Sequence, residues 1–340
     1  MLIVDSHLDL SYNALRGRDV LQPARAQDRD VEGIPTVGLP DLNAGGVGLI
    51  CATIFTLPSV DGKPGYRTAD EAHAEGMRHL DWYRRQSDSG TMRFITTARE
   101  LAEIPQELDG PPQHAILLLE GADPLRTPAD VADWYAAGMR IVGLAWKGTR
   151  YAGGTGQPGP LTTEGIALVE ELDRFGIIHD TSHLAEESFW QLLDLSGGPV
   201  MASHSNCRAI VPTDRQLSDE MIRALAKRGG VIGINFFDRF LLPPDQQGKR
   251  RATLADVALH ARHICDLTGS ASHVAIGTDM DGGLGRDEIP IEIQTSGDLP
   301  RVARALSSAG FNDDDVSAIM GGNWMEFFAG ALPRHDRGAP

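Results

Sequence analysis

Residues 115–120 of the chain read Ala-Ile-Leu-Leu-Leu-Glu, an unbroken apolar run that ends on a carboxylate. A strand that is apolar at every position, and not only at alternate ones, is typical of a parallel sheet covered on both faces. Seven more short apolar runs recur along the chain, each followed by polar residues or by glycine and proline. The predicted strands are 2–4, 47–54, 115–119, 141–145, 176–178, 199–202, 231–234 and 273–277.

Helices are expected between these strands. Thr68 stands three residues before Glu71, the spacing of a capping box at the start of a helix. Residues 164–175 have apolar positions at helical spacing and stop at Gly176, which suits a helix end. Strands that alternate with helices form βαβ units, and eight such units predict a closed barrel. The expected fold is therefore α/β, a (β/α)8 TIM-type barrel of the metal-dependent hydrolase kind.

The same pattern predicts how the chain is divided. Residues 1–332 are expected to form a single catalytic barrel domain, and residues 333–340 a frayed C-terminal tail. Segments 21–41 and 147–161 lack a regular apolar period and are predicted to be long loops. Both follow predicted strands, and barrel enzymes build their active sites from loops in that position.

Composition and charge narrow the class of protein. The chain has 340 residues and a net charge of −16, which argues against binding to nucleic acid or to an anionic membrane, since both need basic patches. Its three cysteines, Cys51, Cys207 and Cys265, are widely spaced, so a reducing compartment is expected. We find no signal peptide, lipidation signal or long apolar run, and therefore predict no membrane anchor and a cytoplasmic location.

Six side chains that can bind a metal ion lie at the predicted carboxyl ends of strands. They are His7, Asp9, Glu120, His183, His204 and Asp279. In a barrel these strand ends converge on one rim, so residues far apart in sequence are expected to meet. Three imidazoles and three carboxylates suit borderline divalent ions such as Zn²⁺. Because a carboxylate has two oxygens, Glu120 can bridge two ions, and ions about 3.5–4 Å apart would hold a hydroxide between them.

Each of these residues taken alone has an ordinary structural explanation. A His-x-Asp sequence such as His7 to Asp9 is common by chance, and His204 could be a hydrogen-bonded core histidine. Their shared position at strand ends is what favours the metal site. His179, beside Asp180, is expected to support the core or the site rather than to bind a metal.

The order of these motifs resembles that of the membrane (renal-type) dipeptidases, metallopeptidase family M19 of the amidohydrolase superfamily. The resemblance extends over nearly the whole chain. It includes a DxHxD opening, a glutamate that bridges metals, and a final GxN signature. The matching segments are 5–10, 120–121, 176–183, 200–209, 276–282 and 321–324.

The resemblance implies the hydrolysis of an amide bond in small dipeptides by a metal-bridging hydroxide, with two Zn²⁺ ions as cofactors. The ligands that it implies are His7 and Asp9 for one ion, His183 and His204 for the other, and Glu120 for both. It further implies that Asp279 is the catalytic acid and base, and that Arg215 holds the substrate carboxylate, to which a guanidinium forks naturally. A homodimer is compatible with the resemblance, although the sequence has no interface signature.

One position departs from the family pattern. Renal-type members have a histidine after the fourth strand that polarises the scissile carbonyl, and Trp146 stands at that position here. Tryptophan donates one N–H and carries no charge, so Trp146 is a candidate substrate-binding residue, and Lys147 and Arg150 are candidates for the electrostatic role. Two alternatives stay open: a related amidohydrolase that acts on N-acyl amino acids or lactams, and a catalytically silent metal-binding relative.

Overall fold

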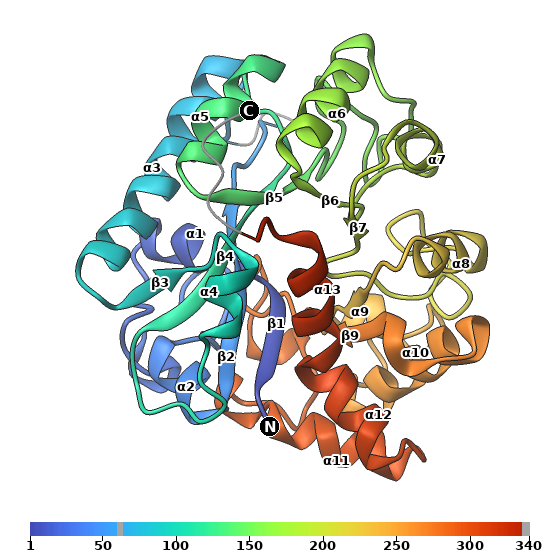
Figure 1. The fold of residues 1–340 in the computed structure, drawn as a ribbon. Helices are drawn as coiled ribbons and strands as arrows, with labels where there is room; N and C mark the ends of the chain where they lie inside the picture. Colours follow the sequence, from blue (N-terminus) through green and yellow to red (C-terminus); the bar gives the residue numbers. More distant parts are fainter. Residues whose placement is uncertain (60–63, 335–340) are drawn as a thin grey trace.

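The computed structural model describes residues 1–59 and 64–334 of the chain. A curled sheet of parallel strands lies at the centre, with helices on its outer side (Figure 1). Within the described residues the strands are β1 (Ile3–Leu8), β2 (Val47–Phe55), β3 (Met92–Phe94), β4 (Gln113–Glu120), β5 (Met139–Gly143), β6 (Ile178–Asp180), β7 (Val200–Met201), β8 (Ile232–Ile234) and β9 (Val274–Ile276).

Most helices lie outside the sheet and follow a strand along the chain (Figure 1). The α-helices are α1 (Leu10–Leu15), α2 (Leu39–Ala44), α3 (Ala69–Asp88), α4 (Ala98–Ala102), α5 (Val131–Ala136), α6 (Thr163–Phe175), α7 (Glu186–Leu195), α8 (Asp219–Lys227), α9 (Asp238–Leu241), α10 (Leu254–Thr268), α11 (Pro300–Ser308), α12 (Asp313–Ser317) and α13 (Asn323–Ala331). Short 3-10 turns occupy Ala24–Ala26, Pro128–Asp130, Ala271–His273, Arg286–Glu288 and Ser296–Asp298, and Ala318–Gly322 is a π-helical turn.

The strands follow the chain order around the barrel. One sheet runs β1-β2-β4-β5-β6-β7, with β3 paired to β4, and β8 pairs with β9 in a second ladder. A parallel bridge between Ala202 and Ile232 joins the two ladders. Between β9 and β1 the contact is made beyond the strand end, where the Thr278 amide donates to Asp5 Oδ1 at 2.9 Å. The α/β barrel architecture predicted from the sequence is confirmed.

Each of the eight predicted strands corresponds to an observed one. The prediction missed β3, a three-residue strand that pairs with the start of β4. Thr68 caps α3 by accepting from the Glu71 amide at 3.2 Å, and α6 ends at Gly176 with a φ of 66°. Thr127 makes no side-chain cap hydrogen bond, and a 3-10 turn lies between it and the start of α5.

Alternation along the strands divides the core into two parts. On β4, Ala115, Leu117 and Leu119 belong to the cluster between the sheet and the outer helices. Their neighbours Ile116 and Leu118 belong to a second cluster inside the barrel. This division follows from the period of two along a strand, and it accounts for the unbroken apolar run in the sequence.

Helix α13 closes the interior cluster. The rings of Trp324 and Phe328 are fully buried there, stacked with centroids 5.3 Å apart, and the Trp324 indole donates to the Ile276 carbonyl at 2.8 Å. A Cβ at Gly321 would lie 2.4 Å from the Leu2 carbonyl oxygen, so only glycine allows the π-helical turn to approach β1 this closely. Asn323 donates to the Val274 carbonyl at 2.8 Å, which ties the same turn to β9.

The predicted loops 21–41 and 147–161 are largely irregular, apart from one 3-10 turn and the start of α2 in the first. Most of the predicted tail, residues 335–340, lies outside the described residues. In the part of the chain that the structure describes, no helix has both the length and the apolar character needed to cross a bilayer.

Candidate metal centre

The alternation of β4 sets the position of Glu120. Ile116 and Leu118 point into the barrel, so Glu120, two residues further along, points to the same side at the carboxyl end of the strand. On β1 the pairing register with β2 shifts between Asp5 and Leu8, and His7 lies within this irregular stretch.

Two residues of the centre have left-handed backbone conformations. His183 has a φ of 66° and Asp279 a φ of 59°. Such angles are uncommon for residues with a side chain and cost free energy, although histidine and aspartate tolerate them better than most. Strain of this kind is often found at functional sites, where it turns a side chain in a direction that regular backbone does not allow.

The two oxygens of Glu120 face different pairs of residues. Oε1 lies 3.3 Å from His183 Nε2 and 3.4 Å from His204 Nε2. Oε2 lies 3.6 Å from His7 Nε2, which in turn is 3.7 Å from Asp9 Oδ2. All five side chains are buried. The structure thus brings together residues that span almost 200 positions of sequence. Glu120 belongs to two overlapping groups of potential ligands, one with His7 and Asp9 and one with His183 and His204, and a third group joins His7, His204 and Asp279.

Hydrogen bonds turn the Nε2 atom of each histidine toward the centre. The Nδ1 atoms of His7 and His204 lie 3.1 Å and 2.7 Å from Ser203 Oγ. The Nδ1 atom of His183 lies 3.0 Å from Thr155 Oγ1. When each Nδ1 carries the hydrogen, each Nε2 has a free lone pair, which is the form that binds a metal.

The buried donor atoms fit a metal ion. His183 Nε2 and His204 Nε2 are 3.0 Å apart, close to the roughly 3.3 Å expected for two nitrogens bound to one tetrahedral zinc ion. Two bare lone pairs at this distance repel each other and Glu120 Oε1 unless a cation lies among them. Among the described residues, His7 Nε2 and Asp9 Oδ1 are buried without a hydrogen-bond partner. A cation would satisfy these atoms as well.

The pKa values of the three histidines in the centre shift in opposite directions. Burial lowers the pKa of His183 and His204 well below the usual value, and the charges of His7 and Arg215 lower it further, so both rings are neutral. Burial also opposes a charge on His7, but Glu120, Asp9 and Asp279 outweigh it and raise the pKa of His7 to about 10. In the metal-free protein a proton on His7 therefore provides positive charge that a metal ion would otherwise supply.

Asp279 lies beside this group, with Oδ1 4.0 Å from His7 Nε2. Its other oxygen accepts a hydrogen bond from Asn235 Nδ2 at 2.9 Å. Burial, with a further contribution from Glu120, raises the pKa of Asp279 to about 7, although His7 and Arg215 oppose this rise. A Cβ at Gly282 would lie 2.0 Å from Asp279 Oδ1, so the glycine leaves the space that this carboxylate occupies.

Arg215 is buried next to the histidines. It donates from Nη2 to the His204 carbonyl at 2.6 Å and from Nη1 to Ser205 Oγ at 3.1 Å. Its Nε is buried and has no partner among the described residues. The guanidinium lies 5.2 Å from the ring of Phe240, which forms part of the cavity wall. Burial lowers the pKa of Arg215 to about 10, so the side chain keeps its charge at neutral pH.

A cavity of about 270 Å³ opens onto the centre. Its wall includes Asp9, Glu120, His183 and Asp279 together with Tyr12, Phe55, Trp146, Lys147, Phe237, Phe240 and Leu284. The ring of Trp146 lies 6.1 Å from that of His183, and Lys147 Nζ lies 5.6 Å from the Trp146 ring. Arg150 instead donates to Asp123 and to the carbonyls of Leu125 and Arg126. Of the two cationic candidates, only Lys147 is therefore in this wall.

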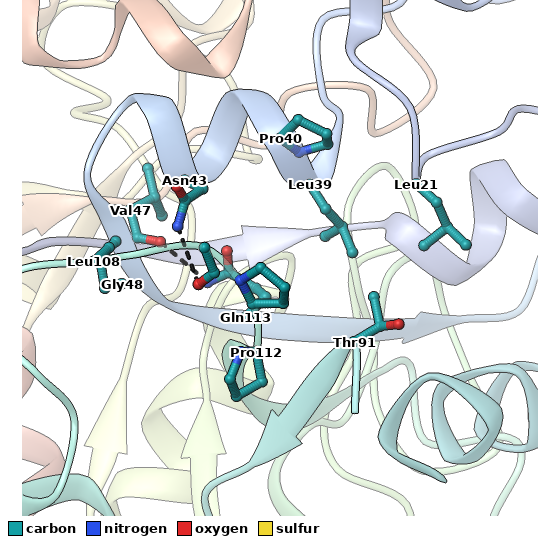
Figure 2. Close-up of a pocket in the computed structure, with 12 residues that line it drawn as sticks. Leu21, Leu39, Pro40, Asn43, Val47, Gly48, Thr91, Leu108, Pro112 and Gln113 are labelled. Atoms are coloured by element: carbon teal, nitrogen blue, oxygen red, sulfur yellow. Dashed lines mark hydrogen bonds between the residues drawn. The ribbon is translucent and has the colours of Figure 1, made fainter. Parts of the chain in front are cut away.

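A second hollow of about 320 Å³ lies at the opposite, amino end of β2 and β4. Figure 2 shows its leucine and proline side chains, together with Asn43 and Gln113. Both side-chain amides donate hydrogen bonds to backbone carbonyls. Asn43 donates to the Gly110 carbonyl at 3.2 Å, and Gln113 donates to the Val47 carbonyl at 3.1 Å. Although this hollow is larger, it is lined by no titratable side chain, and we assign it no chemistry.

The model of the membrane dipeptidase family, peptidase family M19, matches residues 1–331. The chain belongs to this family. The predicted resemblance is confirmed, and the chain is classed with the metal-dependent dipeptidases of family M19.

Several individual proteins are similar to this chain. A metallopeptidase from Rhodobacter sphaeroides, solved with a phosphinate mimic of the dipeptide L-Ala-D-Ala, is 25% identical, with a TM-score of 0.80 over 98% of this chain and 99% of that one. An uncharacterized Klebsiella pneumoniae protein from the pqqA 5' region is 32% identical over 58% of this chain and 73% of its own length. An uncharacterized dipeptidase of Schizosaccharomyces pombe is 28% identical over 58% of this chain, but over only 48% of its own length.

Several supporting residues of this M19 site were not predicted from the sequence. Ser203, Thr155 and Asn235 hold site residues through hydrogen bonds, and Asp180 bonds to Ser203. Ser203 and Asp180 lie within the quoted motifs, next to His204 and three residues before His183, which is the one signal that could have identified them. His179 bonds to Asp173 of α6 at 2.7 Å and supports the core, which was one of its two expected roles.

Proposed function

We propose that this M19 protein hydrolyses the amide bond of small dipeptides at a centre that holds two divalent metal ions, with Zn²⁺ as the expected ion. The proposal rests on the orientation of the Glu120 carboxylate. Its two oxygens face two different pairs of potential ligands. Imidazole nitrogens and carboxylate oxygens are the donor set that zinc prefers.

In this proposal His7 and Asp9 hold one ion, His183 and His204 hold the other, and Glu120 contacts both. His7 Nε2 and Asp9 Oδ1, which are buried without a hydrogen-bond partner among the described residues, would bind the first of these ions. When bound, the ions supply an activated water and polarise the scissile carbonyl. The protein residues around them orient the substrate and move protons.

Asp279 is proposed as the acid and base. Its Oδ2 accepts from Asn235, so Oδ1 is the oxygen left to face the centre and take a proton from the attacking water. The same oxygen then delivers that proton to the leaving amine. The pKa of about 7 suits a group that both takes and gives a proton near neutral pH.

Arg215 is proposed to hold the C-terminal carboxylate of the substrate. Its buried Nε is a donor without a partner among the described residues, and a carboxylate would satisfy it. A guanidinium can offer Nε and one Nη together as a fork to two carboxylate oxygens. The cavity of about 270 Å³ limits the substrate to small molecules.

Trp146 is the structural reason to consider the alternative substrates. Trp146 makes an edge contact with Phe55, with ring centroids 5.2 Å apart, so this side of the cavity is apolar except for Lys147. An apolar wall there accepts an N-acyl group as well as an amino-acid side chain. N-acyl amino acids and lactams are therefore the second candidate substrates.

A substrate panel with the zinc-loaded protein tests the proposal. We expect dipeptides with a free C-terminal carboxylate to be cleaved faster than N-acyl amino acids and lactams. Dipeptides with C-terminal L- and D-residues are both included, because the sequence does not determine stereochemistry. A faster rate on the N-acyl or lactam substrates would favour the second candidate, and a Trp146→His variant would then be expected to shift the preference back to dipeptides.

Two variants test the residues. Asp279→Asn is expected to lower kcat by about 10²- to 10⁴-fold, the usual contribution of a general acid or base. Glu120→Gln is expected to lower both metal content and activity. Glu103→Gln, the same change at an exposed carboxylate paired with Arg93, is the matched control and should leave activity unchanged. Full metal-dependent hydrolysis in the Glu120 and Asp279 variants would disprove the proposal.

Elemental analysis distinguishes the catalytically silent alternative. The account predicts two equivalents of metal per chain, whereas a silent relative with a degraded site would bind less than one and would not be rescued by added Zn²⁺. A cytoplasmic location, a single domain over residues 1–332 and a homodimer stay predictions.

A further inference from the structure

We infer that the hydroxyl of Ser203, held by Asp180, positions one histidine ligand of each metal ion and thereby couples the two metal sites. The inference rests on the proposed two-ion centre. His7 belongs to one group of ligands and His204 to the other, yet both rings contact this one oxygen, at 3.1 Å and 2.7 Å. Ser203 is a positioning residue in this account, since it faces the rings and not the substrate.

Ser203 and Asp180 lie inside the barrel, directly below the metal centre. Met201 and Ile178 belong to the interior apolar cluster. Asp180 lies two residues after Ile178 at the end of β6, and Ser203 lies two residues after Met201, just beyond the end of β7. Alternation therefore turns both polar side chains inward. Ser203 is fully buried and Asp180 nearly so, which leaves them only protein partners.

Counting hydrogens fixes the direction of these hydrogen bonds. Ser203 Oγ lies 2.5 Å from Asp180 Oδ2, so a hydrogen must lie between the two oxygens. Asp180 Oδ1 accepts from the amides of Ser182 and Ser203 at 3.0 Å and 2.8 Å, so the side chain is held as a hydrogen-bond acceptor. The single hydrogen of the serine hydroxyl is therefore donated to Asp180.

With its hydrogen donated, Ser203 Oγ can only accept from the two rings. Both His7 and His204 must then carry a hydrogen on Nδ1, and both Nε2 atoms are left free for metal. One hydroxyl thus sets the tautomer of a ligand in each site. Thr155 provides the contrast, because its hydroxyl contacts one ligand only, His183, through Nδ1 at 3.0 Å and through the backbone carbonyl at 3.4 Å.

This arrangement predicts different losses for two hydroxyl deletions. Ser203→Ala should weaken the binding of both ions, each by about 10- to 100-fold, the usual cost of removing a partner of a metal ligand. Thr155→Val, a matched deletion of a hydroxyl, should weaken only the ion bound by His183 and His204, by a similar factor.

Asp180→Asn gives an independent prediction. The amide oxygen would stay with the Ser182 and Ser203 N–H groups, so the NH₂ group would face Ser203 Oγ and donate to it. The serine would then donate its own hydrogen to His7 or His204, which lie closer to it than the next acceptor, Ser182 Oγ at 3.5 Å, and that ring would carry its hydrogen on Nε2. One ion should therefore be lost, or bound far more weakly than the other, although the serine itself is unchanged.

The experiment is a Zn²⁺ titration of the metal-free proteins against a chromophoric chelator, together with long-range ¹H–¹⁵N spectra of the histidine rings in the zinc-loaded proteins. For the wild type we expect two ions and a hydrogen on Nδ1 of His7 and His204. A wild type that binds fewer than two ions would overturn the proposed function itself.

If the wild type binds two ions, the variants test this inference separately from the proposed function. Losses at both sites in Ser203→Ala and at one site in Thr155→Val support it. Unchanged affinities in Ser203→Ala, or a loss at only one site, contradict it. If Ser203→Ala does not fold, Asp180→Asn decides: two equally tight ions and unchanged ring tautomers contradict the coupling.

Discussion

The two ends of the barrel differ in how their buried polar atoms are satisfied. At the amino end of β2 and β4, the hollow of about 320 Å³ has its Asn43 and Gln113 amides bonded to backbone carbonyls. At the carboxyl end, the smaller cavity of about 270 Å³ is lined by Asp9. Asp9 and the nearby His7 and Arg215 have buried atoms without partners among the described residues.

The difference shows that cavity size does not locate function in this fold. Buried polar atoms in proteins are nearly always hydrogen-bonded, so a cluster of unsatisfied atoms needs an explanation such as an ion or a ligand. The same strands pass through both ends. Among the described residues, His114 Nδ1 is an isolated atom of this kind near the amino end of β4, whereas several such atoms lie together at the carboxyl end. Variants at the two ends should therefore have very different effects.

The largest of these effects, beyond the Asp279 and Glu120 variants, is expected from Gly282→Ala. The new Cβ would lie 2.0 Å from Asp279 Oδ1 and must displace that carboxylate. Because a misplacement of about 1 Å can cost about 100-fold in rate, we expect kcat to fall by that order. Steady-state kinetics give the value, and metal content serves as the control that the ligands are intact. An unchanged kcat would show that the position of Asp279 is unimportant.

Arg215→Met is expected to lower kcat/KM for dipeptides by about 10- to 150-fold, since a hydrogen bond to a charged group contributes about 1.5–3 kcal/mol. Dipeptide amides, which lack the C-terminal carboxylate, should be cleaved equally by the variant and the wild type. An equal loss on acids and amides would mean that Arg215 supports the structure and does not bind the carboxylate.

His7 at the carboxyl end should also make the stability of the metal-free protein depend on pH. The pKa of His7 is raised to about 10 in the metal-free protein, so its stabilising contribution is complete below about pH 6.5 and is lost as the pH rises toward 10. Zinc displaces this proton and so binds up to about tenfold more tightly per pH unit over that range. The Tm gap between zinc-loaded and metal-free protein should therefore widen from pH 6.5 to 10. Calorimetry measures it, and a constant or narrowing gap would contradict the assignment.

The smallest effect is expected at the amino end. Leu21 lines the larger hollow but is exposed, so Leu21→Ala should change the free energy of unfolding by no more than about 0.5 kcal/mol. Its kcat/KM and metal content should equal those of the wild type. A loss of activity in this variant would mean that a change at the amino end affects catalysis at the carboxyl end, which contradicts the contrast between the two ends.

Much of this molecule could be predicted from the sequence because its signals are local. The apolar run before Glu120 specifies a strand, and the capping residue Thr68 specifies the start of a helix. The barrel topology then brings distant strand ends together. The strand β3 was missed because three residues carry too little pattern. Its identity depends on pairing with β4, which is a tertiary contact.

The supporting residues of the site were harder to predict for the same reason. Ser203 is one of several serines near His204, and nothing in its sequence distinguishes a hydroxyl that contacts two rings from one that faces solvent. Asn235 follows a short strand with no motif, and only the fold brings it to Asp279. Arg150, a sequence candidate for the cavity, proved to be bound to Asp123.

The most direct test of the central claim is anomalous X-ray diffraction at the zinc absorption edge from zinc-soaked crystals of the protein. The account predicts two peaks about 3.5–4 Å apart, one on each side of the Glu120 carboxylate. One peak lies near His7 and Asp9, and the other near His183 and His204. A single peak, or peaks away from Glu120, would contradict the two-ion centre.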